Sequence, residues 1–390
     1  MQSAGKPDEK PRLRGMNLAE LEDLCVGAGF EKFRGRQLFQ WIQKRGIRAI
    51  DEMKNMPTAL RGWLTEHTVL GGISEATAMQ ASLDGSTKFL FQLEDGKKVE
   101  SVLMPDPKKA YWTLCLSSQV GCAVDCKFCV TGFNGFFRHL KVDEIIDQVL
   151  YAKHYLIQQH PDANFRNLVY MGMGEPLLNT DAVIKSIRIL TSRDGIDLSG
   201  RRITVSTSGI IPGMIQLSEA ETGACLALSL NAPSQAEREK IMPITKKYLL
   251  KDVLDVCRKY PFAKHKRVTM EYVLLAGVND QPEHAHRLRA LLKGIPCKVN
   301  LIPWNPNPQL PFARTKDEDI QQFVDILAAD HYTVSVRWSK ALDVNGACGQ
   351  LAGQSRQRKP RPAEETPVEM PTDLDFFATV SADGEEEDNG

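Results

Sequence analysis

Residues 117–134 read SSQVGCAVDCKFCVTGFN and place Cys122, Cys126 and Cys129 within eight residues. The stretch directly follows TLCLSS, which is strand-like and opens a long run of alternating strand-like and helical segments. Folding alone does not require three thiols this close together. In a reducing compartment, such a cluster points to metal binding or to thiol chemistry rather than to disulfides.

The bulk composition is that of an ordinary globular chain. The 390 residues are 42% hydrophobic and 25% charged, which leaves room for a large core and two or three domains. The N-terminus, MQSAGKPDEKPRLRG, has no apolar segment of the signal-peptide type, and no run is long enough to cross a bilayer. We therefore expect a cytoplasmic protein without a membrane partner. A monomer is a separate expectation, which the sequence does not decide.

The net charge of zero hides an asymmetry along the chain. From Ala363 onward there are ten acidic residues and no Lys or Arg, so the 49 basic residues of the body face only 39 acidic ones, a formal charge of about +10. Such a surplus suits a nucleic-acid partner. A hypothesis for the acidic tail is that it competes with a nucleic acid for the basic body.

The chain divides into five parts by pattern. Between Lys32 and Arg48, six basic residues are interleaved with Phe33, Phe39 and Trp41, which fits either a solvated helix face or a phosphate-contacting surface. The expected parts are a disordered start (1–14), a helical RNA-binding accessory domain (15–72), a short β linker (73–108), an α/β core with a C-terminal cysteine loop (109–353) and a disordered acidic tail (354–390).

At least six β-α units follow one another in the core, from TLCLSS to TVSVRWS. This alternation predicts a parallel sheet, and six or more units favour a full or partial (βα) barrel of the TIM type. Closure of the barrel is left open by the sequence. Functional residues of such a sheet lie at the C-terminal ends of its strands.

Two kinds of site fit the C-x3-C-x2-C spacing. A structural zinc ion needs four protein ligands, and His139, ten residues past Cys129, lies outside the usual short spacings. A [4Fe–4S] cluster held by three thiolates keeps one iron open for a substrate or cofactor. Phe128, between the last two thiols, would shield such a cluster from water.

The segment MGMGEP follows the buried strand NLVYM. Gly172 and Gly174 let the backbone approach a ligand closely, and the carbonyls there and Glu175 are suited to accept hydrogen bonds from a cationic amine. Taken alone, the segment equally fits an ordinary βα turn.

C-x3-C-x-Φ-C after the first strand of a (βα) barrel resembles the radical S-adenosylmethionine (SAM) superfamily, in which three cysteines hold a [4Fe–4S] cluster. The resemblance implies that the open iron binds SAM, that SAM is cleaved to a 5′-deoxyadenosyl radical, and that MGMGEP is the glycine-rich SAM-amine site.

Two further cysteines narrow the choice. Cys115 lies seven residues before Cys122, and Cys348 lies in NGACGQLAG, where glycines and polar neighbours favour an accessible, reactive thiol. The other four cysteines sit in apolar contexts typical of structural fillers. TLCLSSQVGCAVDCKFCVTG, YMGMGEPLLN, TVSTSGI, SLNAP, NLIPWNP and ACGQLAG together resemble the RNA adenine methyltransferases of the RlmN/Cfr family over residues 16–353.

That resemblance implies a reaction at C2 of adenine in 23S rRNA and in tRNA next to the anticodon, with two SAM molecules per turnover. It assigns Cys348 as the methyl-carrying thiol, Cys115 as the resolving thiol in a transient disulfide with Cys348, and Glu100 as proton acceptor. A flavodoxin- or ferredoxin-type protein would supply electrons. The implied SAM contacts are Gly174, Glu175, Ser206, Ser229, Leu230, Asn231 and Asn305, and several of these also suit plain turn positions.

Three positions depart from the family pattern. The family usually has His where Asn231 stands, Gly where Ala341 stands and Ala where Gly346 stands. Two alternative functions remain open: the sister reaction at C8 of adenine, which gives antibiotic resistance, and a non-catalytic, zinc-stabilised RNA-binding protein. The second alternative gives no reason for Cys115, Cys348 or the GEP segment.

Overall fold

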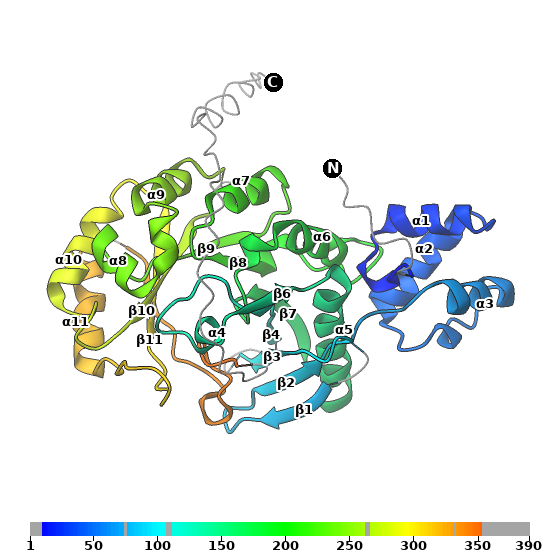
Figure 1. Cartoon of the computed structure of the whole chain (residues 1–390), viewed down its shortest axis with the longest axis horizontal. Helices are drawn as coiled ribbons and strands as arrows, with labels where there is room; N and C mark the ends of the chain where they lie inside the picture. Colours follow the sequence, from blue (N-terminus) through cyan, green and yellow to red (C-terminus); the bar gives the residue numbers. More distant parts are fainter. Residues whose placement is uncertain (1–9, 74–75, 107–110, 262–265, 331, 353–390) are drawn as a thin grey trace, which may run out of the picture.

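The computed structural model describes residues 10–73, 76–106, 111–261, 266–330 and 332–352. An elongated α/β body carries a group of short helices at one end (Figure 1). The proposed acidic tail and residues 1–9 lie outside the described residues.

The helices at that end come from the N-terminal part of the chain. They are η1 (Leu13–Gly15), α1 (Leu18–Gly27), α2 (Phe33–Phe39), η2 (Gln40–Arg45), η3 (Ile50–Glu52) and α3 (Thr58–His67). Asn17 begins α1 because its side chain accepts a hydrogen bond from the Glu20 amide, while the Glu20 carboxylate accepts one from the Asn17 amide. Gly35 lets α2 pack closely on α1, since a Cβ there would lie 2.4 Å from Glu22 Cα.

Order begins earlier than the sequence indicated. We expected residues 1–14 to be disordered, but the side chain of Leu13 is fully buried and Arg12 bridges to Val69 by backbone pairing. The polar composition of the first residues concealed this one apolar anchor.

A ten-stranded sheet forms the body, in the order β1-β2-β3-β4-β7-β8-β9-β10-β11-β12. Its strands are β1 (Ala76–Ala81), β2 (Thr87–Gln92), β3 (Lys98–Pro105), β4 (Tyr111–Cys115), β7 (Asn164–Tyr170), β8 (Ile203–Thr207), β9 (Cys225–Ser229), β10 (Val268–Leu274), β11 (Cys297–Pro303) and β12 (Val334–Val336). All pairs from β4 to β12 are parallel. The strands β1 and β12 end the order and do not pair with each other, so the barrel is partial. The sequence predicted either a full or a partial barrel.

The region expected as a short β linker belongs to this sheet. The strands β1, β2 and β3 pair antiparallel with one another, and β3 pairs antiparallel with β4 from Val102–Cys115 to Pro105–Trp112. They continue the sheet beyond its parallel part.

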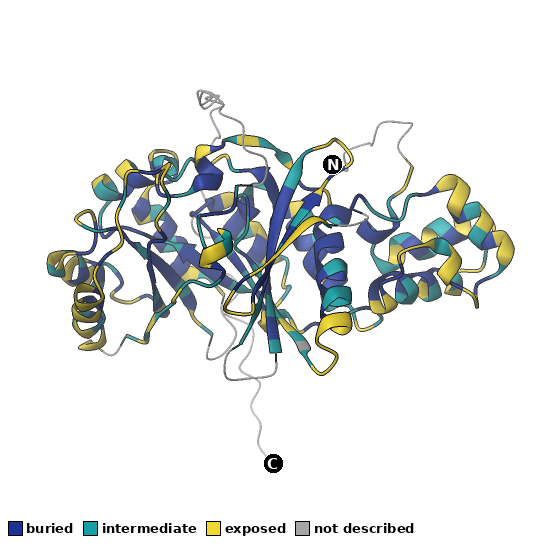
Figure 2. Cartoon of the chain, turned by 90° about the horizontal axis from the view of Figure 1, so that it is seen from below, coloured by how far each residue is buried: buried dark blue, intermediate teal, exposed yellow. Residues whose placement is uncertain are grey.

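Helices join successive parallel strands and lie around the outside of the curved sheet (Figure 1). They are α5 (Val142–Gln159), α6 (Thr180–Thr191), α7 (Ile211–Glu219), α8 (Gln235–Ile241), α9 (Leu250–Lys259), α10 (Pro282–Leu291) and α11 (Asp317–Ala328). Figure 2 shows the strands largely buried and the outer faces of the helices exposed. In the described part of the chain, no helix is both long and apolar enough to span a bilayer.

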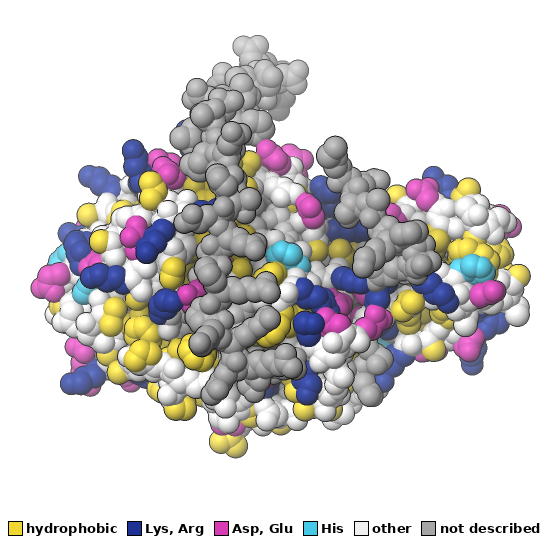
Figure 3. Space-filling view, viewed as in Figure 1, with side chains coloured by type: hydrophobic (Ala, Val, Ile, Leu, Met, Phe, Trp, Pro, Cys, Tyr) yellow, Lys and Arg dark blue, Asp and Glu magenta, His cyan; other side chains and the backbone are white. Residues whose placement is uncertain are grey.

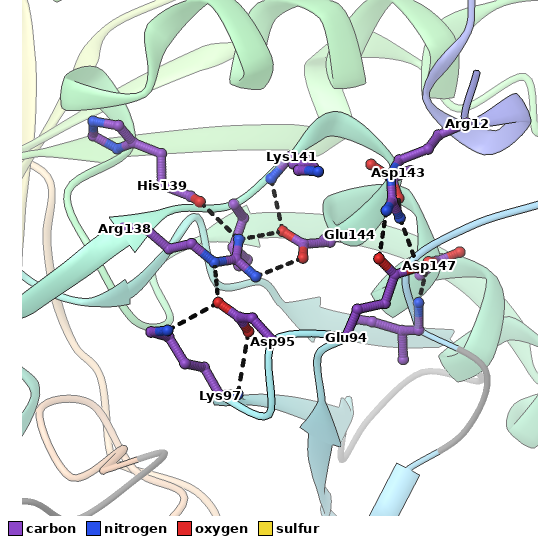
Figure 4. Close-up of polar contacts among 12 residues, drawn as sticks. Arg12, Glu94, Asp95, Lys97, Arg138, His139, Lys141, Asp143, Glu144 and Asp147 are labelled. Atoms are coloured by element: carbon purple, nitrogen blue, oxygen red, sulfur yellow. Dashed lines mark hydrogen bonds and ion pairs between the residues drawn. The ribbon is translucent and has the colours of Figure 1, made fainter. Parts of the chain in front are cut away.

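Buried ion pairs on α5 hold the N-terminal helices to the body (Figure 4). Arg14 Nη1 donates to Asp147 Oδ1 at 2.5 Å, and the Ile73 amide donates to Asp147 Oδ2 at 2.8 Å. Arg12 bridges Asp143, at 3.2 Å, and Glu94. One helix of the body thus anchors both the N-terminal segment and the β2–β3 turn.

On the parts of the face in Figure 3 that are not drawn grey, Lys and Arg side chains are interspersed with Asp and Glu side chains. The basic side chains visible there form no single patch.

Candidate active site

The three-cysteine loop leaves the sheet at the end of β4. It passes through β5 (Gln119–Gly121), turns at Cys122, Cys126 and Cys129, and enters α4 (Val130–Phe133); β5 pairs with β6 (Phe136–His139). Gly121 has φ +74°, and a Cβ there would lie 1.9 Å from the Gly135 carbonyl oxygen, so only glycine fits at this crossing.

A cavity of about 170 Å³ lies over the C-terminal ends of the parallel strands. Most of the residues that the sequence singled out line it. They are Cys122, Cys126, Cys129, Gly174, Glu175, Ser206, Ser229, Asn231, Asn305 and Cys348. The cavity therefore joins the three-thiol loop, the glycine-rich turn and the cysteine of the C-terminal segment.

Burial raises the pKa of each of the three loop thiols above that of a free cysteine. Neighbouring thiols raise these pKa values further: Cys122 and Cys129 do so for Cys126, and Cys348 does so for Cys129. Metal coordination reverses this effect, because a bound metal takes up the thiolate form. In the described residues no group of three or more His, Cys, Asp or Glu is arranged to hold a single metal ion. A cluster takes each thiolate on a different iron, and three half-buried thiols that line one cavity fit that donor set.

The glycine-rich turn packs directly against the start of the thiol loop. Gly174 has φ +100°, and a Cβ there would lie 2.4 Å from Gln119 Cβ. The Glu175 carboxylate accepts hydrogen bonds from the Ser208 amide at 2.7 Å, the Ser208 hydroxyl at 2.8 Å and the Leu177 amide at 3.1 Å. Burial raises the Glu175 pKa above its ordinary value, and the hydrogen bonds from these donors offset only part of that rise. The turn thus fixes a buried carboxylate on the cavity wall.

The remaining expected SAM contacts differ in position. Ser206 and Ser229 lie at strand ends on the cavity, but the fully buried Leu230 does not line it. Asn231 has φ +59°, a conformation in which Asn is favoured, and its Oδ1 accepts from the Val273 amide at 2.8 Å. Asn at this departure from the family pattern therefore fixes the backbone between β9 and β10.

The C-terminal cysteine segment is held against the thiol loop. Asn305 Nδ2 donates to the Cys348 carbonyl at 3.0 Å, the Val130 amide donates to the Gly349 carbonyl at 2.8 Å, and Thr131 Oγ1 donates to the Leu351 carbonyl at 2.6 Å. These contacts place the Cys348 thiol on the cavity wall beside the loop cysteines.

Cys115 lines a second cavity, of about 380 Å³, and Cys348 lines both. All nine cysteines are free thiols, so the disulfide named among the expected features is not present. Burial raises the pKa of Cys115 to about 12, the nearby Cys348 adds to this, and Arg337 opposes it. The Cys115 and Cys348 thiols thus lie close enough to interact without being bonded.

Glu100 lies away from both cavities. The residue is buried, and its side chain forms a 3.3 Å ion pair with Lys88 and accepts a hydrogen bond from the Ala352 amide at 2.8 Å. The carboxylate therefore supports the C-terminal segment four residues after Cys348.

Sequence reasoning missed two arginines. Arg238 is fully buried and donates to the carbonyls of Ser229, at 2.9 Å, and Leu230, at 3.0 Å. Burial lowers the Arg238 pKa to about 10, although Cys126 and Glu175 raise it. Arg337 lines both cavities. Arg337 directly follows a strand, a position from which a functional role could have been predicted. Arg238 lies in an ordinary charged helix, and nothing in that pattern indicates a functional role.

A partial parallel barrel with three half-buried cysteines after its first parallel strand is the arrangement of a radical SAM protein. Residues 116–288 match the radical SAM superfamily, and residues 12–70 match the ribosomal RNA large subunit methyltransferase N-terminal domain. A crystal structure of a radical SAM methyltransferase from Sphaerobacter thermophilus is similar, with a TM-score of 0.84 and 38% identity, covering 88% of this chain and all of that one.

Curated relatives are similar over almost the whole chain. A dual-specificity RNA methyltransferase RlmN from Anaeromyxobacter sp. (strain Fw109-5) is 44% identical over 93% of this chain and 96% of its own. One of the same name from Geobacter sulfurreducens is 43% identical over 89% of this chain and 94% of its own. The chain belongs to the RlmN family of dual-specificity RNA methyltransferases.

Proposed function

We propose that this chain methylates C2 of adenine in 23S rRNA and in tRNA, using SAM both as methyl donor and as radical source. One observation carries the proposal: Cys348 lines one cavity with the three loop thiols and a second cavity with Cys115. A thiol that relays a methyl group between SAM and a base must reach both.

The residues around the first cavity are suited to bind the cofactors. Cys122, Cys126 and Cys129 would hold a [4Fe–4S] cluster, and the polar groups of Gly174, Glu175, Ser206, Ser229 and Asn305 would bind SAM. With SAM, the cluster supplies a 5′-deoxyadenosyl radical. An electron donor of the flavodoxin or ferredoxin type would be needed.

Direct methylation of C2 is unfavourable because this amidine carbon is electron-poor. In the proposed route, the Cys348 thiolate takes the methyl group of one SAM, leaving S-adenosylhomocysteine. The Arg337 guanidinium interacts electrostatically with Cys348, and its positive charge would favour the thiolate over the thiol. The radical supplied by SAM and the cluster would take one hydrogen atom from the S-methyl group, and the carbon radical left on Cys348 would add to C2. The adduct would then have to lose the C2 proton and one electron, which the oxidised cluster or its electron donor would take up, to give a closed-shell Cys348–CH2–adenine thioether.

Cys115 is placed to release the product. Its thiolate attacks the Cys348 sulfur, the sulfur–carbon bond breaks, and the electron pair stays on the carbon, which takes a proton. A Cys115–Cys348 disulfide results, and a dithiol reductant must open it before the next turnover. Glu100 is the proposed acceptor of the C2 proton; because its carboxylate contacts Lys88 and Ala352 in this structure, that role requires the C-terminal segment to move.

The test compares wild type with Cys348→Ala and Cys115→Ala, purified without oxygen and supplied with SAM, a reductant and RNA. Nucleoside mass spectrometry should find 2-methyladenosine with wild type and none with Cys348→Ala. Cys115→Ala should stay covalently joined to RNA, visible as a shifted band that nuclease removes. Formation of 8-methyladenosine, or normal turnover by Cys115→Ala, would overturn the proposal.

A further inference from the structure

The second cavity runs along the inside of the sheet, away from the SAM candidates. Alternate residues of β4 and β7 line it, Thr113 with Cys115 and Asn167 with Val169, and it reaches Arg201 and Arg202, which precede β8. The SAM candidates lie at the opposite, C-terminal ends of the strands. A molecule in the second cavity therefore reaches Cys348 without crossing the first.

Only Met171, Arg337 and Cys348 line both cavities. Among the described residues, these three side chains form the boundary between the two spaces. Arg337 Nη1 contacts Met171 Sδ at 3.2 Å, which closes the boundary beside the Cys348 thiol.

The wall of the second cavity is basic. Arg201, Arg202, Arg337 and Lys340 line it, against a single acidic residue, Asp106. Arg201 and Arg202 are exposed, and within the described part of the chain no ion pair engages either guanidinium. Free guanidinium groups beside a cavity suit phosphate groups.

An aromatic platform lies on the same wall. Trp338 is 53% exposed although it is large and apolar, and the Arg314 guanidinium lies 5.4 Å from its ring centroid. Next to it, Ser339 Oγ is buried and makes no hydrogen bond within the described residues. An exposed indole and an unsatisfied hydroxyl on a basic wall suit a nucleotide, which has a flat face, polar edges and a phosphate.

We propose that the second cavity is the RNA-binding side of the site: the target nucleotide reaches Cys348 and Cys115 from the N-terminal ends of the strands, Trp338 stacks on a base, and Arg201 and Arg202 contact phosphates. The inference rests on the proposed function and adds the route and the residues. The two thiols then act from one side of the boundary on the base, while SAM stays on the other.

Fluorescence anisotropy with a labelled RNA hairpin that carries an unpaired loop adenine tests this inference, on anaerobically prepared full-length protein. Trp338→Ala should weaken binding roughly 5- to 150-fold, the range of one lost base stack, and Trp338→Tyr should keep most of the affinity. The Arg201→Ala/Arg202→Ala pair should weaken binding and lower the slope of log affinity against log salt by about 1 to 2.

The matched control is Lys246→Ala/Lys247→Ala, an exposed basic pair beyond α8 that lines neither cavity. It should bind RNA with the wild-type salt slope, and thermal melting of every variant confirms folding. Suppose that the wild-type protein forms 2-methyladenosine, but the Arg201→Ala/Arg202→Ala and Trp338→Ala variants bind RNA with unchanged affinity and salt slope. That result would overturn the inference and leave the proposed function standing. If the wild-type protein leaves RNA unmodified, the proposed function is overturned as well.

Discussion

Ala341 and Gly346 show how two departures from the family pattern explain each other. Ala341 has φ +57°, where a Cβ costs roughly 1–2 kcal/mol relative to glycine. A Cβ on Gly346 would lie 2.8 Å from the Ala341 Cβ, too close for both residues to carry one. The family usually places the methyl group at the second position, and this chain places it at the first.

A swap of the two residues tests that reading. Gly346→Ala alone should destabilise the protein by about 1–3 kcal/mol through overpacking next to Cys348. The double variant Ala341→Gly/Gly346→Ala should regain wild-type stability, because it removes both the clash and the left-handed alanine. Urea unfolding of these two variants and of Ala341→Gly measures the effects; a double variant whose change in stability equals the sum of the two single changes would show that the two sites are independent.

Among the helices, α5 carries the anchor of the N-terminal segment, and that anchor should make stability depend on pH. Burial raises the pKa of Asp147 to about 6, although Arg14 opposes the shift. The folded chain therefore holds a proton that the unfolded chain has lost between about pH 4 and 6, and the free energy of unfolding falls as pH rises through this window.

Asp147→Asn should remove that slope, which for one proton is at most about 1.4 kcal/mol per pH unit. A guanidinium group stays charged over this pH range, so the loss of the Asp147 partner of Arg14 changes the free energy of unfolding by the same amount at every pH. Unfolding free energies of both proteins, measured from pH 4 to 7, give the difference; a difference that does not change with pH would contradict the assignment.

At the level of the whole molecule, charge separates the body from the tail. The body carries about +10 by formal count, and residues 363–390 carry ten acidic side chains. Deleting 363–390 should raise RNA affinity at low salt, and the gain should fade as salt screens the charges. RNA binding measured across a salt series checks this; an unchanged affinity at low salt would remove the competition hypothesis.

The sequence indicated the parallel sheet and most of the cavity wall, because both depend on local patterns. C-x3-C-x2-C, MGMGEP and the strand-end serines are short segments whose places follow from β-α order. Leu13 was expected in a disordered start, and the short strands of residues 73–108 were expected as a linker rather than as part of the main sheet, since both roles depend on contacts distant in sequence. Arg238 and Glu100 show the same limit: their partners, Ser229 and Ala352, are set by packing.

The central claim is that Cys348 carries the methyl group from SAM to the base. Wild-type protein that reacts with SAM bearing a CD3 methyl group tests it directly, with the product nucleoside analysed by mass spectrometry. The account predicts a CD2H methyl group on adenine and the third deuterium in 5′-deoxyadenosine. An intact CD3 group on adenine would mean direct transfer and would contradict the account.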